Sequence, residues 1–373
     1  MRVPPAFSRR EPQNLKKEKT KMKAMPLLTR LIDGEDLSRE ELTLLLSSFD
    51  EEDKIQAAER AREIALSRFG NKIFIRGIIE FSNYCKNDCL YCGIRKSNRC
   101  ASRYRLEDEE ILSCCENGYQ LGFRTFVLQS GEDPGFSDKR LERLVRRIRA
   151  LYPDCAITLS VGEKSRETYQ RFFDAGANRY LLRHETANPQ HYSKLHPPEL
   201  HPKNRIRCLK DLKEIGFQTG CGSMIGSPYQ TFENLAEDLL FMKEFRPHMI
   251  GTGPFIPHKD TPFCDKAAGS AELTLFFLSI LRIMHPNVLL PATTALGTLR
   301  GNGRQLGILS GANVVMPNLS PLQVREKYLL YDNKIGTGEE AAENIQLLRK
   351  SIAEIGYELV LERGDYDEHR GEL

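Results

Sequence analysis

Residues 72–98 read KIFIRGIIEFSNYCKNDCLYCGIRKSN. The first ten are rich in isoleucine and phenylalanine, which favours a buried strand. Three cysteines follow within eight residues, at Cys85, Cys89 and Cys92, in the spacing C-x3-C-x2-C. The sequence therefore predicts a strand that leads directly into a group of thiols.

The alternation of strand and helix that begins at residue 73 continues to about residue 317. Seven further β-prone runs follow the first, and most are separated by amphipathic stretches such as DKRLERLVRRIRALY (138–152). Strands that alternate with helices favour a parallel sheet. Eight repeats over about 245 residues predict an α/β fold, a closed (β/α)8 TIM barrel. A doubly wound open sheet is the alternative. In a barrel, active-site groups lie at the C-terminal ends of the strands, which is where the cysteines fall.

Both ends of the chain lie outside this repeat. Residues 1–25 hold eight Lys or Arg against two Glu without an apolar secretory core, which favours a disordered tail over a targeting peptide. Ser38 and Glu41 form a predicted capping box, and a second helix is expected from about Asp53 to Phe69. The predicted division is a basic tail (1–25), N-terminal helices (26–72), a barrel (73–336), and a C-terminal helix and tail (337–373).

Composition excludes several classes of protein. The 373 residues are 40% hydrophobic and 28% charged, as in a globular protein in water, and no apolar run approaches the roughly 20 residues of a membrane span. A net charge of +3 gives no general nucleic-acid signal. Ten cysteines in a long chain without a secretory signal favour free thiols and metal ligands, and hence a reducing, cytoplasmic setting.

Three thiols with no fourth in register suit zinc poorly, because structural zinc sites are tetrahedral and take four ligands. Iron–sulfur clusters are held by thiolates throughout. A [4Fe–4S] cluster held by three cysteines has one iron without a protein ligand, and an external molecule can chelate that iron. A zinc-binding module and three incidental surface cysteines are the alternatives at this point.

Charged residues also alternate along one predicted strand. In RYLLRHETANP (179–189), Arg179, Arg183 and Glu185 share one face with Leu181 because side chains alternate along a strand. Charges that point into a barrel need partners or a ligand, and an ion-pair network near the barrel mouth is the alternative. HETAN lacks the second histidine of a zinc-protease helix, so His184 is interpreted as structural.

The pattern C-x3-C-x-aromatic-C, with Tyr91 before Cys92, resembles the signature of the radical S-adenosylmethionine (radical SAM) superfamily. The resemblance implies a [4Fe–4S] cluster on Cys85, Cys89 and Cys92 that binds SAM and cleaves it reductively to methionine and a 5′-deoxyadenosyl radical. QSGEDP (129–134) resembles the family's glycine–glutamate element, which takes the SAM ammonium. The residues then expected to bind SAM are Tyr91, Gln129, Gly131, Glu132, Ser160, Glu185, Arg205 and Met224.

Further blocks, among them GSMIG (222–226), GPFIPHKDTP (253–262), PATTALGT (291–298) and ANVVMPN (312–318), resemble the radical SAM maturase of FeFe-hydrogenase, the HydE family. The blocks span residues 73–331. The resemblance implies a role in assembling the hydrogenase H-cluster, on a cysteine-derived substrate such as a cysteine-bound iron carbonyl–cyanide unit. It implies other maturases and an electron donor as partners, and neither nucleic acid nor membrane. The residues expected at the substrate are Ser130, Thr158, Arg179, Arg183, Thr293, Thr294, Met316, Tyr328 and Tyr331.

Three alternatives stay open beside this family. Biotin synthase and methylornithine synthase are its neighbours, and a cluster-carrying scaffold without catalytic activity is the third. No cysteine follows Cys264, which argues against an auxiliary cluster in the C-terminal part.

Overall fold

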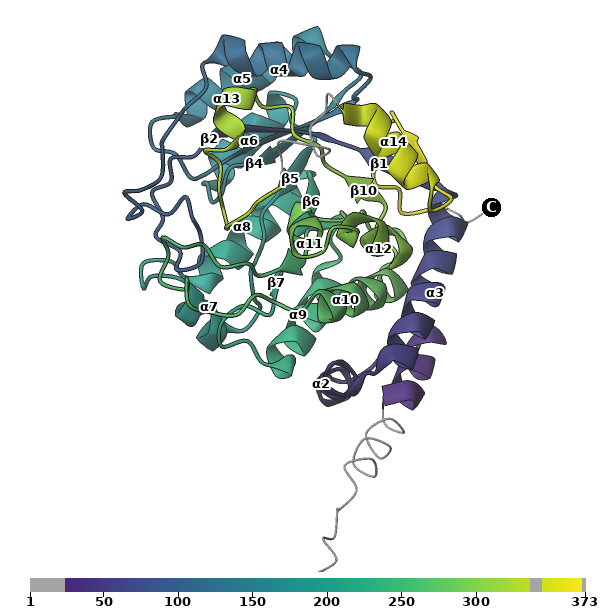
Figure 1. Ribbon diagram of the computed structural model, residues 1–373. Coiled ribbons are helices and arrows are strands. Elements are labelled where there is room, and N and C mark those ends of the chain that lie inside the picture. The colour runs from purple at the N-terminus through teal and green to yellow at the C-terminus, as the bar shows by residue number, and fades with distance from the viewer. Residues whose placement is uncertain (1–23, 336–343, 371–373) are drawn as a thin grey trace, which may run out of the picture.

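The computed structural model describes residues 24–335 and 344–370 of the chain. Its strands lie at the centre, and helices surround them (Figure 1). The strands are β1 (Lys72–Ile75), β2 (Gly77–Ser82), β3 (Thr125–Ser130), β4 (Ala156–Ser160), β5 (Arg179–Leu181), β6 (Gln218–Cys221), β7 (Met224–Ile225), β8 (Met249–Ile250), β9 (Gly253–Pro254), β10 (Val314–Val315) and β11 (Glu358–Val360).

The main sheet is parallel, as the alternation of strand and helix predicts. Its six strands follow the order β2-β3-β4-β5-β6-β8, and each neighbouring pair runs parallel. A second parallel sheet contains β10, β1 and β11, and β7 pairs with β9. The prediction of an α/β fold with a parallel sheet is confirmed.

The predicted closed ring of eight strands is not one continuous ladder in the described residues. Past β8, isolated parallel bridges join Met249 to Leu289, Pro291 to Val314, and Ile78 to Asn318. Pro291 and Pro317 interrupt the last two predicted strands, because proline has no N–H group to donate to a neighbouring strand. The later strands are therefore shorter than the sequence pattern suggests.

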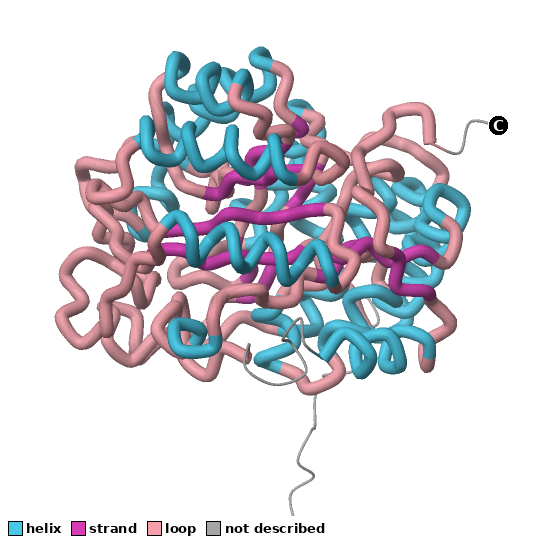
Figure 2. The backbone as a smooth tube through the Cα atoms, turned by 90° about the horizontal axis from the view of Figure 1, so that it is seen from above, coloured by secondary structure: helices cyan, strands magenta, loops and turns pink. Residues whose placement is uncertain are grey.

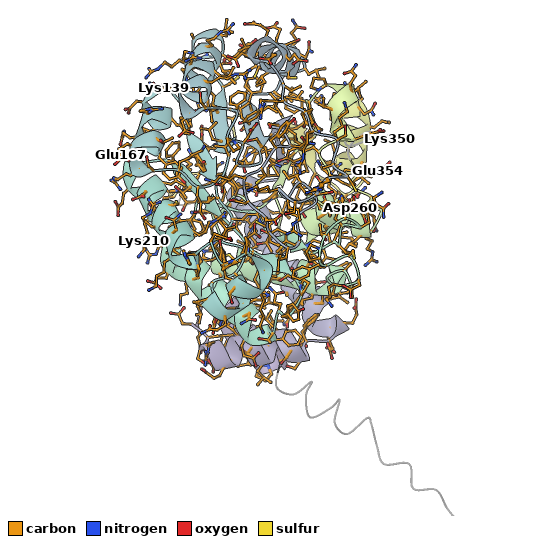
Figure 3. The ribbon with its side chains drawn as sticks, turned by 90° about the vertical axis from the view of Figure 1, so that its left-hand side faces the viewer. Lys139, Glu167, Lys210, Asp260, Lys350 and Glu354 are labelled. Carbon is orange, nitrogen blue, oxygen red and sulfur yellow. The ribbon has the colours of Figure 1, made fainter. Side chains whose placement is uncertain are left out.

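Each covering helix buries one apolar stripe. In α5 the buried Leu, Val and Ile residues recur at helical spacing. Figure 2 shows helices on both sides of the strands. In Figure 3 the exposed side chains of Lys139, Glu167 and Lys210 project outward from the helices over residues 138–151, 166–174 and 202–215. The helices are α2 (Arg39–Ser48), α3 (Glu51–Phe69), α4 (Asp108–Gln120), α5 (Asp138–Leu151), α6 (Arg166–Asp174), α7 (Pro189–Leu195), α8 (Pro202–Ile215), α9 (Phe232–Phe245), α10 (Ala271–Met284), α11 (Thr294–Leu299), α12 (Gly303–Leu309), α13 (Leu322–Arg325) and α14 (Ile345–Ala353). Within residues 24–335 and 344–370, no helix has both the length and the apolar character that crossing a membrane requires.

A helical segment over residues 24–32 comes first, and local capping residues start the next two helices, α2 and α3. Ser38 caps α2, and its capping box with Glu41 is present as predicted. Helix α3 begins at Glu51, two residues before the predicted start, because Asp50 and Asp53 form a second capping box. The predicted basic tail (1–25) lies almost wholly outside the described residues.

The C-terminal segment contains a strand that the sequence analysis did not predict. After α14, β11 pairs with β1 in parallel, and residues 363–366 then run across the N-terminal ends of the strands. Arg363 O accepts hydrogen bonds from Thr125 Oγ1 at 2.9 Å and from Arg179 Nη2 at 2.8 Å. The backbone N–H of Tyr366 donates to Gln218 Oε1 at 3.0 Å. This segment therefore covers the end of the main sheet that lies opposite the cysteines.

Candidate active site

The three cysteines lie in a loop that directly follows β2, and hydrogen bonds within the loop fix its shape. The guanidinium of Arg103 donates to four backbone carbonyls, at distances of 2.5–3.1 Å, from Asn83, Ile94, Arg95 and Asn98. The Asp88 carboxylate accepts from Arg95 Nε at 2.7 Å and from Ser97 Oγ at 2.6 Å. The loop is thus organised by its own side chains.

Two neighbouring segments hold the same loop in place. The N–H of Leu90 donates to Leu195 O, and the N–H of Gly93 donates to Leu330 O, both at 2.9 Å. A Cβ atom at Gly93 would lie 2.2 Å from Leu329 O. Glycine is therefore required where the cysteine loop meets the loop around residue 330.

The three thiols are partly exposed and lie close enough to interact electrostatically. Burial, with the neighbouring Cys85 thiol, raises the pKa of Cys92 to about 12. Burial, then Cys92 and Cys85, raises the pKa of Cys89 well above its ordinary value, and burial raises the pKa of Cys85. Neutral thiols are thus favoured until a cationic group binds the thiolates.

The donor set fits an iron–sulfur cluster better than a single ion. Across residues 24–335 and 344–370, no three His, Cys, Asp or Glu side chains are spaced to hold one metal ion. In an iron–sulfur cluster each cysteine binds an iron of its own, so the thiols need not converge on one point. Three adjacent thiols beside a cavity meet that requirement.

A cavity of about 300 Å³ lies against the thiols at the C-terminal ends of the strands. Its volume is at the lower end of the range for small-molecule sites, which is about 300–1,000 Å³. The structure brings together here most of the predicted site residues: Cys85, Tyr91, Cys92, Gln129, Ser130, Gly131, Glu132, Ser160, Arg183, Glu185, Arg205, Met224, Thr293, Tyr328 and Tyr331.

Gly131 and Glu132 connect the end of β3 to the cysteine loop. A Cβ atom at Gly131 would lie 2.3 Å from Tyr84 O and 2.8 Å from Cys85 Cβ, so only glycine fits between them. The Glu132 carboxylate accepts from the backbone N–H of Glu163 at 3.0 Å and lies 3.1 Å from Lys86 Nζ. Glu132 thus joins the cysteine loop to the loop after β4.

Two charged residues of the cavity are left without complete hydrogen bonding. Arg183 Nη2 and Glu185 Oε2 lie 3.0 Å apart as an ion pair. Arg183 Nε, Arg183 Nη2 and Glu185 Oε2 are buried, and none of the three makes a hydrogen bond. Arg205, by contrast, donates to Glu163 Oε1 at 2.6 Å and to Arg183 O at 3.1 Å. Because Arg183 and Glu185 also line the cavity, these atoms are available to a bound ligand.

Arg179 is a correction to the predicted site. Its guanidinium is fully buried and bonds Asp365 Oδ1 at 2.8 Å, at the opposite end of β5 from the cavity. The strand alternation predicts Arg179 on the same face as Arg183, but four residues of extended chain separate the two by about 13 Å. Arg179 therefore holds the C-terminal segment and does not line the cavity.

Four other predicted residues also lie outside the cavity lining. Cys89 belongs to the same loop as the two lining cysteines. Thr158 is buried in the middle of β4 with an unpartnered hydroxyl. Thr294 begins α11, which displaces it from the lining, whereas its neighbour Thr293 caps that helix and lines the cavity. Met316 packs against the apolar cluster around Phe74.

The apolar and backbone part of the lining was not predicted from the sequence. Asn87, Ile94, Gly162, Leu181, Leu182, Gly253, Pro254, Phe255, Ile256, Ala295 and Leu330 complete the cavity. Most of these residue types carry no chemical signal of their own. Gly162 is an exception, because it precedes Glu163 after β4 as Gly131 precedes Glu132 after β3, and this repetition could have identified it.

Comparisons with known proteins agree with this geometry. Residues 79–242 match the model of the radical SAM superfamily. The chain is 43% identical to the [FeFe] hydrogenase maturase subunit HydE of Thermotoga maritima over 87% of this chain and 92% of that protein. It is 30% identical to the 3-methylornithine synthase of Methanosarcina acetivorans over 88% and 92% of the two chains. A crystal structure of methylornithine synthase (PylB) superposes with a TM-score of 0.77 at 28% identity, covering 90% of this chain and 97% of that one.

Proposed function

The chain belongs to the HydE family of the radical SAM superfamily, and on this premise we propose that Cys85, Cys89 and Cys92 hold a [4Fe–4S] cluster beside a SAM-binding cavity. The protein is a radical SAM enzyme of FeFe-hydrogenase maturation. When bound, the cluster supplies the electron that cleaves the carbon–sulfur bond of SAM. The observation that supports the proposal best is the position of the three interacting thiols against a cavity that also holds two incompletely bonded charged side chains.

SAM binding is proposed for eight residues that line the cavity. Gly131 lies against Tyr84 and Cys85, so its backbone can approach the amino group of a ligand held at the cluster. Glu185 offers a carboxylate oxygen without a hydrogen-bond partner, which suits a hydroxyl or ammonium donor. The remaining proposed SAM contacts are Tyr91, Gln129, Glu132, Ser160, Arg205 and Met224, all of which line the cavity.

Substrate binding is proposed for a second group of residues that line the same cavity. The guanidinium of Arg183, which is ion-paired with Glu185 and has two nitrogen atoms without hydrogen bonds, suits a carboxylate or another anion. Gln129 Nε2 lies 3.4 Å from Tyr328 Oη, so these two groups can orient a polar substrate atom together. Ser130, Thr293 and Tyr331 add hydroxyl groups, and the apolar lining excludes water. We propose a cysteine-derived substrate, such as a cysteine-bound iron carbonyl–cyanide unit, supplied by another maturase.

Finer features of the fold, cellular setting and partners are also proposals. The isolated bridges past β8 support a (β/α)8-type ring over residues 73–336, flanked by N-terminal helices (26–72) and a C-terminal helix and tail (337–373). The electron comes from a separate donor, and the setting is cytoplasmic and anaerobic.

Anaerobic reconstitution tests the central proposal. We expect a brown protein with about four iron and four sulfide per chain, which forms 5′-deoxyadenosine and methionine from SAM when dithionite is added. Cys89→Ala should abolish both the colour and SAM cleavage. Cys264→Ala is the matched control, because Cys264 is an exposed free thiol outside the motif, and it should behave as wild type. Colour and SAM cleavage that both survive in Cys89→Ala would contradict the proposal.

Methylornithine synthase activity is the second candidate, because a 3-methylornithine synthase matches 88% of the chain. The reconstituted protein should be incubated with SAM, dithionite and lysine. Formation of methylornithine would favour this alternative, and its absence alongside turnover of the iron–cysteine substrate would exclude it.

A further inference from the structure

His184 and Asp238 form a pair behind the cavity, and both side chains are fully buried. His184 Nε2 lies 3.3 Å from Asp238 Oδ1. The other ring nitrogen, Nδ1, accepts a hydrogen bond of 3.2 Å from the backbone N–H of Gly222. Because Nδ1 is the acceptor, the ring proton is on Nε2 and points at the carboxylate. The pair thus connects the end of β6 to helix α9.

This pair also fixes the segment that carries the cavity charges. His184 lies between Arg183 and Glu185, the two residues with buried unpartnered atoms. Asp238 Oδ1 accepts a further hydrogen bond of 2.6 Å from the backbone N–H of Ala187. Residues 183–187 are therefore attached to α9 at two points.

The attached segment has a strained backbone. Glu185 has a φ of 67°, in the left-handed region that side chains other than glycine seldom adopt. Such a conformation costs on the order of 1–3 kcal/mol and persists where surrounding contacts determine it. The N–H of Glu185 donates to Gly222 O at 3.0 Å, and Gly222 in turn donates to His184. The histidine thus belongs to a closed set of contacts that imposes this conformation.

We infer that His184 and Asp238 are positioning residues, which hold Arg183 and Glu185 in the orientation needed for SAM and substrate. The inference rests on the proposed function, since it assigns a purpose to the geometry of the SAM site. It also refines the interpretation of His184 as structural, because the pair acts on a defined functional segment.

Two variants of His184 separate its two contacts. In His184→Asn the amide oxygen can replace Nδ1 and keep the bond from Gly222, but it cannot reach Asp238. In His184→Gln the amide nitrogen can replace Nε2 and keep the bond to Asp238, but Gly222 loses its acceptor. Asp238→Asn is the conservative variant, because its Oδ1 can still accept from both His184 and Ala187.

A matched control comes from a distant buried contact. Asn313 Oδ1 accepts from Arg282 Nη2 at 3.2 Å and from the N–H of Leu290 at 2.9 Å, both remote from residues 183–187. Asn313→Ala therefore removes a comparable buried side-chain link without touching the cavity segment.

The readouts are hydrogen–deuterium exchange of the unloaded protein and equilibrium binding of SAM to the reconstituted protein. Both His184 variants should exchange faster over residues 183–187 and bind SAM roughly tenfold more weakly, the loss typical when a residue that orients a ligand-binding group is removed. Asp238→Asn and Asn313→Ala should keep wild-type values for both readouts, whatever their thermal stability.

Wild-type exchange and SAM affinity in both His184 variants would overturn the inference, as would an equal loss of affinity in Asn313→Ala. If one His184 variant fails to fold, the other decides the outcome. Wild-type protein that does not bind SAM would contradict the proposed function. In that case the exchange measurement would still show whether the pair orders residues 183–187.

Discussion

Gly131 illustrates how closely single residues are fitted at the site. Its missing side chain leaves room for the carbonyl of Tyr84 and the Cβ of Cys85. The sequence motif predicts Gly131 as a SAM contact, and its packing against the cysteine loop supports that proposal. Arg179 was misplaced because alternation along a strand specifies a face but not the height along the strand.

Gly131→Ala should displace the cysteine loop. The added methyl group would overlap backbone atoms, and overpacking of this kind costs about 1–3 kcal/mol. We expect less iron per chain after reconstitution and weaker SAM binding, measured by iron analysis and equilibrium binding. Gly301→Ala is the control, since no atom lies within 4 Å of a Cβ there. Full iron content and unchanged SAM affinity in Gly131→Ala would refute the steric argument.

The ion pair of Arg179 with Asp365 should make the free energy of unfolding depend on pH in the acidic range. Burial would raise the pKa of Asp365, but Arg179 and Arg363 outweigh burial and lower it to about 2. A depressed carboxyl pKa contributes stability that is complete above the unfolded value of about 4 and is lost as pH falls toward 2. Urea unfolding from pH 5 to pH 3 should show a steeper loss in wild type than in Arg179→Gln.

The same variant tests the corrected position of Arg179. SAM affinity at neutral pH should match wild type, because the side chain lies at the far end of β5. A large loss of SAM affinity without loss of stability would show that Arg179 does contribute to the binding site.

Among helices and strands, those specified by a few neighbouring residues were the easiest to predict. The capping box of Ser38 with Glu41 was predicted from four residues because the interaction is contained within them. Strand β11 was missed because its three residues, Glu358–Val360, are stabilised by pairing with β1, which lies far away in the sequence. The lengths of the predicted strands that contain Pro291 and Pro317 were overestimated for a similar reason. A parallel strand depends on pairing with its neighbours as much as on its own residues.

The Leu359→Ala variant measures how much β11 contributes to the free energy of unfolding. Leu359 is buried to 6% exposure in the main core, and a Leu-to-Ala change in a core typically costs about 2–5 kcal/mol. We expect a loss in this range in the free energy of unfolding. Glu358→Ala is the neighbouring control, because Glu358 is exposed and should change stability little. A loss below about 0.5 kcal/mol for Leu359→Ala, the size of a surface change, would show that β11 is not docked in solution.

At the scale of the molecule, the repeat of strand and helix predicted where the site would form. Side chains from β3, β4 and the segment after β5 meet the cysteine loop at one end of the sheet. The loop around Tyr328 and Leu330 completes the cavity. Its position could not be predicted from the sequence, because it depends on contacts with Gly93.

SAM should stabilise the folded chain as a whole if it binds this cavity. A ligand at 100 times its Kd adds about 2.7 kcal/mol when it binds only the folded state. The Tm of the reconstituted protein should therefore rise by several degrees with SAM under anaerobic conditions. The Tm of Cys89→Ala should not rise with SAM. An equal rise in that variant would show that SAM binds without the cluster.

In the described residues, 363–366 cover the end of the main sheet opposite the cavity. With that end covered, a substrate placed deeper than SAM would have to arrive before it, and its product would leave only after methionine and 5′-deoxyadenosine had diffused away. The order of ligand arrival and departure would therefore be dictated by a few residues at the remote end of the chain, which never touch the reacting atoms.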